Sequence, residues 1–168
     1  MNLIEIFKKE LENEAATTRK MLAVVPNNKS DWKPHTKSMS MQQLTTHIAE
    51  IPGWIDMILN TSELDFNGGN YQPTIINNTE ELLEAFEKNY QKGKLALEKA
   101  NEKQLTDTWT MKGGDKIYSS ELKHESIRHT LCQIVHHRAQ LGVYLRLLDI
   151  PIPASYGASA DDMGVFGE

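Results

Sequence analysis

The sequence contains little cysteine, since Cys132 is the only one among 168 residues. A single thiol cannot form a disulfide within the chain, and it excludes a zinc site built from several cysteines. Basic residues are also outnumbered, with 18 Lys and Arg against 23 Asp and Glu and a formal net charge of -5. This balance argues against nucleic acid as a partner, because non-specific binding needs a basic face that neutralises phosphates.

Long apolar runs are lacking as well. No run approaches the ~18 residues of a membrane span, and the first residues lack the basic and apolar regions of a signal peptide. We therefore expect a cytoplasmic protein with no membrane partner. The length, with 39% apolar and 24% charged residues, predicts a single globular domain over residues 1–168, with an extended tail over residues 151–168.

Four stretches carry apolar residues at steps of three and four, which predicts four amphipathic helices. They cover residues 4–25, 41–58, 79–100 and about 119–148, and the last is the longest. Pro52-Gly53 falls inside the second stretch and should kink that helix. This pattern predicts an all-α fold in the form of a four-helix bundle.

The connections between these helices are of mixed length. Residues 61–78 read as a long polar loop, with Gly68-Gly69-Asn70 and Pro73 as helix-breaking residues. Gly113-Gly114 lies between two short β-prone runs, which predicts a small hairpin before the fourth helix. Long loops and a hairpin make a simple up-down-up-down bundle the less favoured form.

The histidines on the second and fourth helices are the candidate functional residues. Each residue of an α-helix advances by about 100°, so His137 lies at the border of the apolar face, whereas His136 points outward. His47 shares a face of the second helix with Leu44 and Ile51, and it should also point inward. Two imidazoles from different helices can bind a divalent metal ion and leave a position for water or substrate. The alternative is that both are ordinary histidines of the core or its boundary.

Residues on the outer flank of the fourth helix suggest a second role for its surface. His129 and His136 share that flank with Val143 and Leu147, and a partly apolar flank on a long helix predicts a homodimer. Cys132 is expected to be buried as a small hydrophobic residue rather than to act as a nucleophile beside His136.

Three segments together resemble one known family. The run His136-His137-Arg138-Ala139-Gln140-Leu141-Gly142-Val143-Tyr144-Leu145-Arg146 resembles the fourth-helix signature of DinB-like proteins. Residues 47–54 are similar to the second helix of one branch of that family, and residues 150–162 are similar to its tail. Because the order of helices and loops agrees too, the resemblance covers nearly the whole chain.

This resemblance implies a DinB/YfiT-like four-helix bundle, often dimeric, that holds a divalent metal ion, commonly nickel or zinc, with three histidines. Carried over to this chain, the ligands are His47 on the second helix, position 133, and His137 on the fourth. The residue at position 133 is Gln133, and an amide oxygen is a poorer ligand than imidazole for such metals. His129 is no simple replacement, because it lies two turns, or ~12 Å, from His137 along the helix.

The family activities that the resemblance implies include the transfer of sulfur groups with a metal-activated low-molecular-weight thiol, and the isomerisation of maleylpyruvate. One hypothesis is therefore a metal-dependent, thiol transferase-like enzyme acting on a small-molecule substrate. The alternative is a non-enzymatic, stress-associated binding dimer with a degenerate metal site, which Gln133 favours. The family name refers to induction by DNA damage and implies no binding to DNA.

Overall fold

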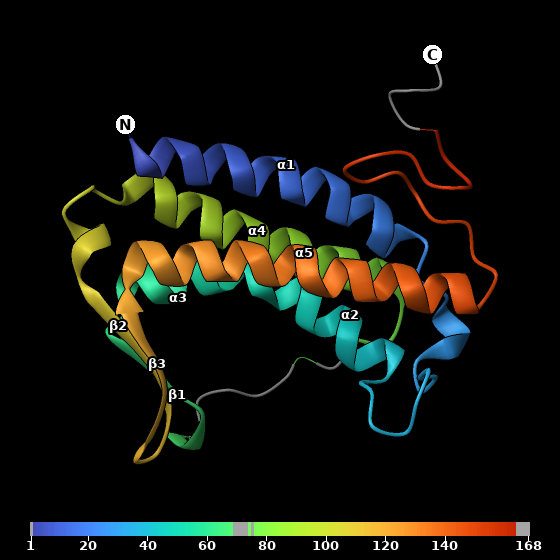
Figure 1. Ribbon diagram of the computed structural model, residues 1–168, viewed down its shortest axis with the longest axis horizontal. Helices are drawn as coiled ribbons and strands as arrows, with labels where there is room; N and C mark the ends of the chain where they lie inside the picture. Colours follow the sequence, from blue (N-terminus) through green and yellow to red (C-terminus); the bar gives the residue numbers. More distant parts are fainter. Residues whose placement is uncertain (1, 69–73, 75, 164–168) are drawn as a thin grey trace.

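The computed structural model describes residues 2–68, 74 and 76–163, and in this part of the chain it has five α-helices. The helices run side by side as a bundle (Figure 1). The helices are α1 (Leu3–Ala23), α2 (Met41–Glu50), α3 (Trp54–Asn60), α4 (Thr79–Lys99) and α5 (Lys123–Leu147). The predicted four-helix bundle is confirmed, because α2 and α3 together form its second helix.

The division between α2 and α3 is the predicted kink. A short 3-10 turn, Ile51–Gly53, carries Pro52 at its start and joins the two helices. Gly93 of α4 packs against this turn so closely that an added Cβ would lie 2.4 Å from the Pro52 carbonyl oxygen. A glycine is therefore required where α4 crosses the break.

The core lies where the apolar periodicity places it. Each large side chain withdrawn from water here stabilises the fold by roughly 1.5–3 kcal/mol before the loss of chain entropy offsets it. The buried apolar residues of the first two helices of the bundle include Ile4, Phe7, Leu11, Ala15, Leu22, Met41, Leu44, Ile48, Ile51, Ile55 and Ile58.

The helix starts are set by side-chain caps. Ser40 accepts a hydrogen bond from the Gln43 backbone N–H and begins α2, and the Gln43 side-chain oxygen accepts one from the Ser40 backbone N–H. Asn78 accepts from the Glu81 backbone N–H and begins α4 at the predicted position. Both caps satisfy backbone donors that have no partner within the helix.

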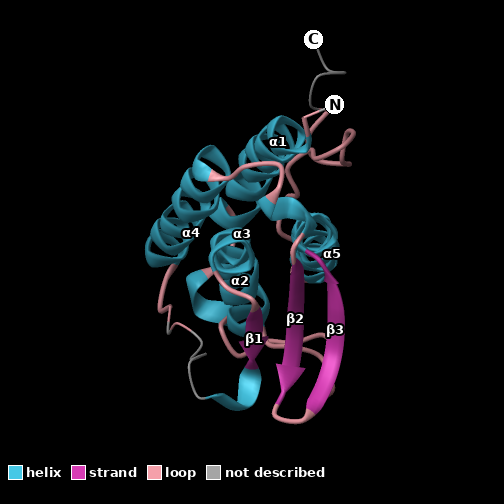
Figure 2. Ribbon diagram, turned by 90° about the vertical axis from the view of Figure 1, so that its left-hand side faces the viewer, coloured by secondary structure: helices cyan, strands magenta, loops and turns pink. Residues whose placement is uncertain are grey.

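A three-stranded sheet lies at one end of the bundle (Figures 1 and 2). It contains β1 (Glu63–Asp65), β2 (Thr108–Gly113) and β3 (Lys116–Leu122), in the order β1-β2-β3. The strands β2 and β3 are antiparallel and form the predicted hairpin, with Gly114 at a φ of +61° in its turn. The strand β1, which pairs parallel to β2, was not predicted.

Two predicted boundaries are wrong. The fourth helix was expected to begin near Ser119, but Ser119 pairs with Met111 in the hairpin, and α5 begins only at Lys123. The stretch 61–78 is not wholly loop, because it contains β1 and a 3-10 turn at Phe66–Gly68. Its predicted breakers Gly69, Asn70 and Pro73 lie outside the described residues.

The tail after α5 has no regular structure up to residue 163 and passes over one end of α1 (Figure 1). Asp161 pairs with Arg146 of α5 and accepts a hydrogen bond from the Ile152 backbone N–H, 3.0 Å away. The tail is therefore anchored to the last turn of α5. In the part of the chain described, no helix is long and apolar enough to cross a membrane.

Candidate metal centre

His47 of α2 and His137 of α5 lie face to edge between their helices. Their ring centroids are 4.7 Å apart and the ring planes cross at 75°. His137 is buried, with 8% of its surface exposed, and His47 is half-buried. The structure thus brings together the two histidines that the helical faces single out.

Two further rings extend this pair. The Trp54 ring lies edge-on to His47 at 5.9 Å, just after the break between α2 and α3. The His136 ring lies 4.8 Å from that of His137, although the His136 side chain is exposed as its position on the helix predicts. His137 is therefore the middle member of a row of three imidazoles.

The environment favours the neutral form of both histidines. Burial lowers the pKa of His47, the proximity of His137 lowers it further, and Glu50 partly opposes the shift. Burial also lowers the pKa of His137, a hydrogen bond to Gln140 opposes this, and His136 adds to the lowering. Neutral imidazoles keep the nitrogen lone pair that a metal ion requires.

Gln133 is not part of this contact. Its side chain is half-exposed, and its amide Nε2 lies 3.1 Å from His129 Nε2, on the outer side of α5. Because Nε2 contacts His129, the amide oxygen is the atom of Gln133 that remains to bind a metal ion. Gln133 and His129 thus form a pair of their own, one helical turn apart.

The residues present offer a metal ion two histidine ligands rather than three. Across the described ranges, no group of three or more His, Cys, Asp or Glu side chains is arranged to hold a metal ion. His47 and His137 offer two neutral imidazoles, and Gln133 offers one weak amide oxygen. Any ion here would keep open coordination positions for water or substrate.

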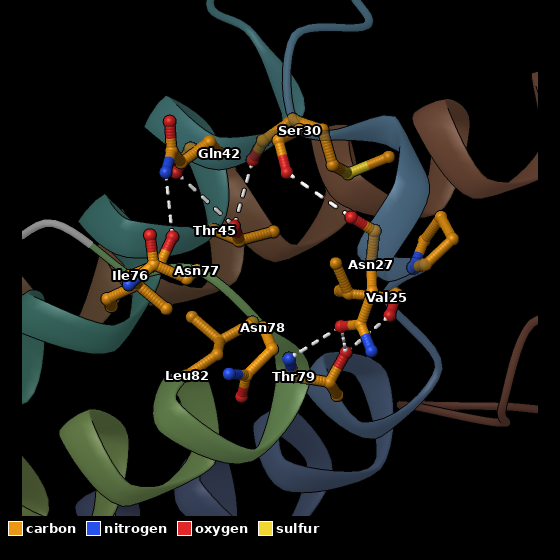
Figure 3. Close-up of a pocket in the computed structure, with 12 residues that line it drawn as sticks. Val25, Asn27, Ser30, Gln42, Thr45, Ile76, Asn77, Asn78, Thr79 and Leu82 are labelled. Carbon is orange, nitrogen blue, oxygen red and sulfur yellow. Dashed lines mark hydrogen bonds between the residues drawn. The ribbon is translucent and has the colours of Figure 1, made fainter.

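The pocket drawn in Figure 3 contains neither histidine. It lies between the start of α2 and the start of α4 and has a volume of about 20 Å³, room for roughly one water molecule. Its polar groups already bond to one another, as Gln42 does to the Ile76 carbonyl at 2.7 Å and Thr79 to Asn27. These hydrogen bonds connect the start of each of these helices with the segment that precedes the other.

A buried ion pair next to His137 was missed by the sequence reasoning. Arg138 and Glu14 lie 2.7 Å apart with side chains 3% and 6% exposed, and Arg138 also donates to Thr18 Oγ1 at 3.1 Å. The hydroxyl of Tyr156, in the tail, donates to Glu14. The sequence holds one indication that Glu14 is buried. Glu14 lies at helical spacing between Leu11 and Thr18 on the apolar face of α1.

The expectation that Cys132 is buried is wrong. Its side chain is exposed, and its sulfur lies 3.2 Å from a guanidinium nitrogen of Arg128. Arg128 in turn pairs with Glu10 of α1. Position 132 therefore faces solvent on α5.

This protein is a helical bundle with a small sheet before its last helix. A histidine pair lies between its helices α2 and α5. The sequence profile of the DinB family matches residues 2–164, and the chain belongs to the DinB family. The resemblance predicted from the run His136–Arg146 is thereby confirmed. No curated protein matches the chain.

Several solved structures share this fold. A protein assigned to the DinB family from Exiguobacterium sibiricum matches with a TM-score of 0.68 at 17% identity, over 96% of this chain and 97% of that one. A DinB-like protein from Bacillus subtilis matches with a TM-score of 0.65 at 17% identity, over 85% and 91% of the two chains. A mycothiol-dependent maleylpyruvate isomerase matches at 12% identity with a TM-score of 0.61, over 83% of this chain and 60% of that one. At these identities the likeness shows the fold alone.

Proposed function

We propose that this protein binds a divalent metal ion, nickel or zinc, through His47 and His137, and serves as a metal-dependent, thiol transferase-like enzyme. The observation that carries the proposal is the close pair of neutral imidazoles from α2 and α5. Membership of the DinB family and the fold shared with a thiol-dependent isomerase support it.

The chain's own residues have distinct parts in this proposal. His47 and His137 supply the ligand nitrogens, and Gln133 or water completes the set. When bound, a divalent ion lowers the pKa of a thiol or water molecule and so makes a nucleophile available near neutral pH. A low-molecular-weight thiol and a small-molecule substrate are the partners that this chemistry implies, and a cytoplasmic location would supply the thiol.

The proposal also includes a homodimer formed through the outer flank of α5. Val143 and Leu147 lie one turn apart on that flank, and each is 58% exposed. Exposed apolar residues that adjoin on one helix favour contact with a second surface. The interface would lie on the side of α5 that carries His129 and His136.

One observation favours a second candidate function. The missing third imidazole, with Gln133 turned toward His129, is what a degenerate metal site would leave. On this alternative the protein is a non-enzymatic, stress-associated binding dimer, and the histidine pair is an ordinary part of the boundary between helices.

A metal titration separates the two candidates. Protein purified without a histidine tag is titrated with Ni²⁺ and Zn²⁺ by calorimetry, as wild type and as Gln133→His, His136→Ala and His137→Ala. Gln133→His should tighten binding on the order of tenfold, or ~1.4 kcal/mol, because an imidazole replaces a weak amide oxygen. His137→Ala should remove binding, and His136→Ala should matter far less because that side chain points outward.

Two results would contradict the proposal. If His136→Ala removes binding and His137→Ala keeps it, the assignment of the ligands is wrong. If none of the four proteins binds either ion, the non-enzymatic alternative is the better one. A thiol-transfer assay on the metal-loaded wild type then tests the activity itself.

A further inference from the structure

Gln140 connects two of the three imidazoles. It lies on the exposed side of α5, three residues after His137 and four after His136. Its Oε1 lies 2.8 Å from His137 Nδ1, and its Nε2 lies 3.1 Å from His136 Nε2. A single amide therefore contacts one buried and one exposed histidine at the same time.

The two ends of an amide are not equivalent. The oxygen only accepts hydrogen bonds and the nitrogen only donates them. With the oxygen on His137, the Nδ1 of that ring must carry the proton, and its Nε2 keeps a lone pair. With the nitrogen on His136, the Nε2 of that ring must accept. Gln140 thus selects one tautomer for each ring.

We propose that Gln140 is a positioning residue that holds the proton of His137 on Nδ1 and so reserves the Nε2 lone pair for a divalent metal ion shared with His47. This inference rests on the proposed function for the identity of the ligand. Histidines that bind metals commonly donate their other ring N–H to a carbonyl or carboxylate, which fixes both tautomer and ring orientation. Gln140 has that relation to His137.

The tautomer can be read directly in the metal-free protein. Long-range ¹H–¹⁵N correlation spectra distinguish the protonated from the unprotonated ring nitrogen, and the signals of His137 are assigned by their loss in His137→Ala. The spectra are recorded well above the ordinary imidazole pKa of about 6.5, where the rings are neutral. We expect the proton of His137 on Nδ1 in the wild type.

Three variants test the role of Gln140. Gln140→Glu keeps an acceptor for His137, so it should preserve the Nδ1 proton. Gln140→Leu removes the acceptor, and the proton of His137 should then distribute between the two nitrogens. His129→Ala is the matched control, because it removes an exposed imidazole of α5 that contacts Gln133 rather than Gln140, and it should leave the His137 spectrum unchanged.

Metal affinity supplies the second measurement. Calorimetric titration with Ni²⁺ should show binding 10–100-fold weaker in Gln140→Leu, the usual loss when such a supporting partner is removed, and restored in Gln140→Glu. Because Gln140 is exposed, neither variant disturbs the core, and circular dichroism verifies their helix content.

The inference is overturned if wild-type His137 carries its proton on Nε2, or if Gln140→Leu leaves the tautomer of His137 unchanged. A wild type with the proton on Nδ1 that binds neither Ni²⁺ nor Zn²⁺ gives a different result. In that case the proposed function fails, while the control of the His137 proton by Gln140 stands.

Discussion

His137 and Arg138 are adjacent on α5 but contact different helices, because successive helical residues diverge by about 100°. His137 meets His47 of α2, whereas Arg138 meets Glu14 and Thr18 of α1. The ion pair to α1 fixes the rotation of α5 at this point. It thereby also fixes the direction in which His137 points.

Breaking the buried ion pair should strongly destabilise the protein. Arg138→Leu leaves the carboxylate of Glu14 buried without its partner, and we expect the free energy of unfolding to fall by about 3–5 kcal/mol. Urea denaturation measures this loss. Arg128→Leu is the control, because its pair with Glu10 is largely exposed and should contribute less than about 1 kcal/mol. Equal losses in the two variants would contradict the role given to Arg138.

The histidine pair should make the metal-free protein less stable in mild acid. The pKa values of His47 and His137 both lie below the ordinary imidazole value, so the unfolded chain binds protons at a higher pH than the folded one. Stability therefore falls as the pH drops below about 6.5, and it stops falling once the folded-state pKa values are passed.

Calorimetric melting between pH 8 and pH 5, roughly 1.5 units on either side of the imidazole pKa, tests this dependence. The Tm of the wild type should drop more steeply than that of His137→Leu, which lacks one of the two groups. A variant with the same slope as the wild type would show that the pair does not control the acid sensitivity.

At the scale of elements, α4 crosses the break between α2 and α3 at close range. The 3-10 turn Ile51–Gly53 brings the Pro52 carbonyl against Gly93. Backbone meets backbone here, so neither side can yield by a change of rotamer. The bend at Pro52 and the glycine at position 93 therefore depend on each other.

A methyl group at Gly93 should therefore separate the two elements. Gly93→Ala places a Cβ 2.4 Å from a backbone oxygen, and we expect a net loss of about 1–3 kcal/mol despite the better helix propensity of alanine. Gly142→Ala is the matched control in α5, where the new Cβ meets only Met21 Cε at 3.4 Å. That change should stabilise by about 0.5–1 kcal/mol. Guanidinium denaturation of both variants measures the difference, and equal effects would contradict the argument.

Local patterns were enough to predict most of the elements. The apolar spacing predicted the α-helices of the described residues and the kink at Pro52, and the glycine pair predicted the hairpin. The strand β1 could not be predicted, because it has three residues and exists through pairing with β2, Glu63 opposite Thr110. The start of α5 was misplaced for the same reason, since pairing in the hairpin extends β3 through Ser119 and Ser120.

The candidate site, too, could be predicted from the sequence only in part. Helical geometry was enough to select His137 over His136 and to orient His47. The pair Glu14–Arg138 joins residues 124 positions apart, and no spacing rule connects α1 with α5. The bridge by Gln140 depends on the rotamers of three side chains, which a sequence pattern does not specify.

For the whole molecule, the proposed dimer and the anchored tail both involve the second half of α5. The inner side of that half packs in the core, Arg146 holds Asp161 of the tail, and Val143 and Leu147 remain exposed. The exposed side of this half is the surface on which a second copy of the chain would pack.

Charge on that surface should prevent association. Val143→Glu with Leu147→Glu places two carboxylates where the proposed interface is apolar, and we expect the variant to sediment as a monomer at micromolar concentration while the wild type sediments as a dimer. Ile117→Glu is the control, since Ile117 is 62% exposed on β3, away from α5's outer flank. A wild type that is monomeric, or a dimer that survives the double change, would contradict the proposed interface.

The amide at position 133 also bears on how readily this protein's chemistry can change over generations. Every glutamine codon differs from a histidine codon only in its third base, so a single substitution in the DNA converts Gln133 into the third histidine of the proposed metal site. The half-exposed site lies on a helix whose rotation Arg138 already fixes from the opposite side. Lineages can thus gain or lose the third imidazole without any change in the scaffold that presents it.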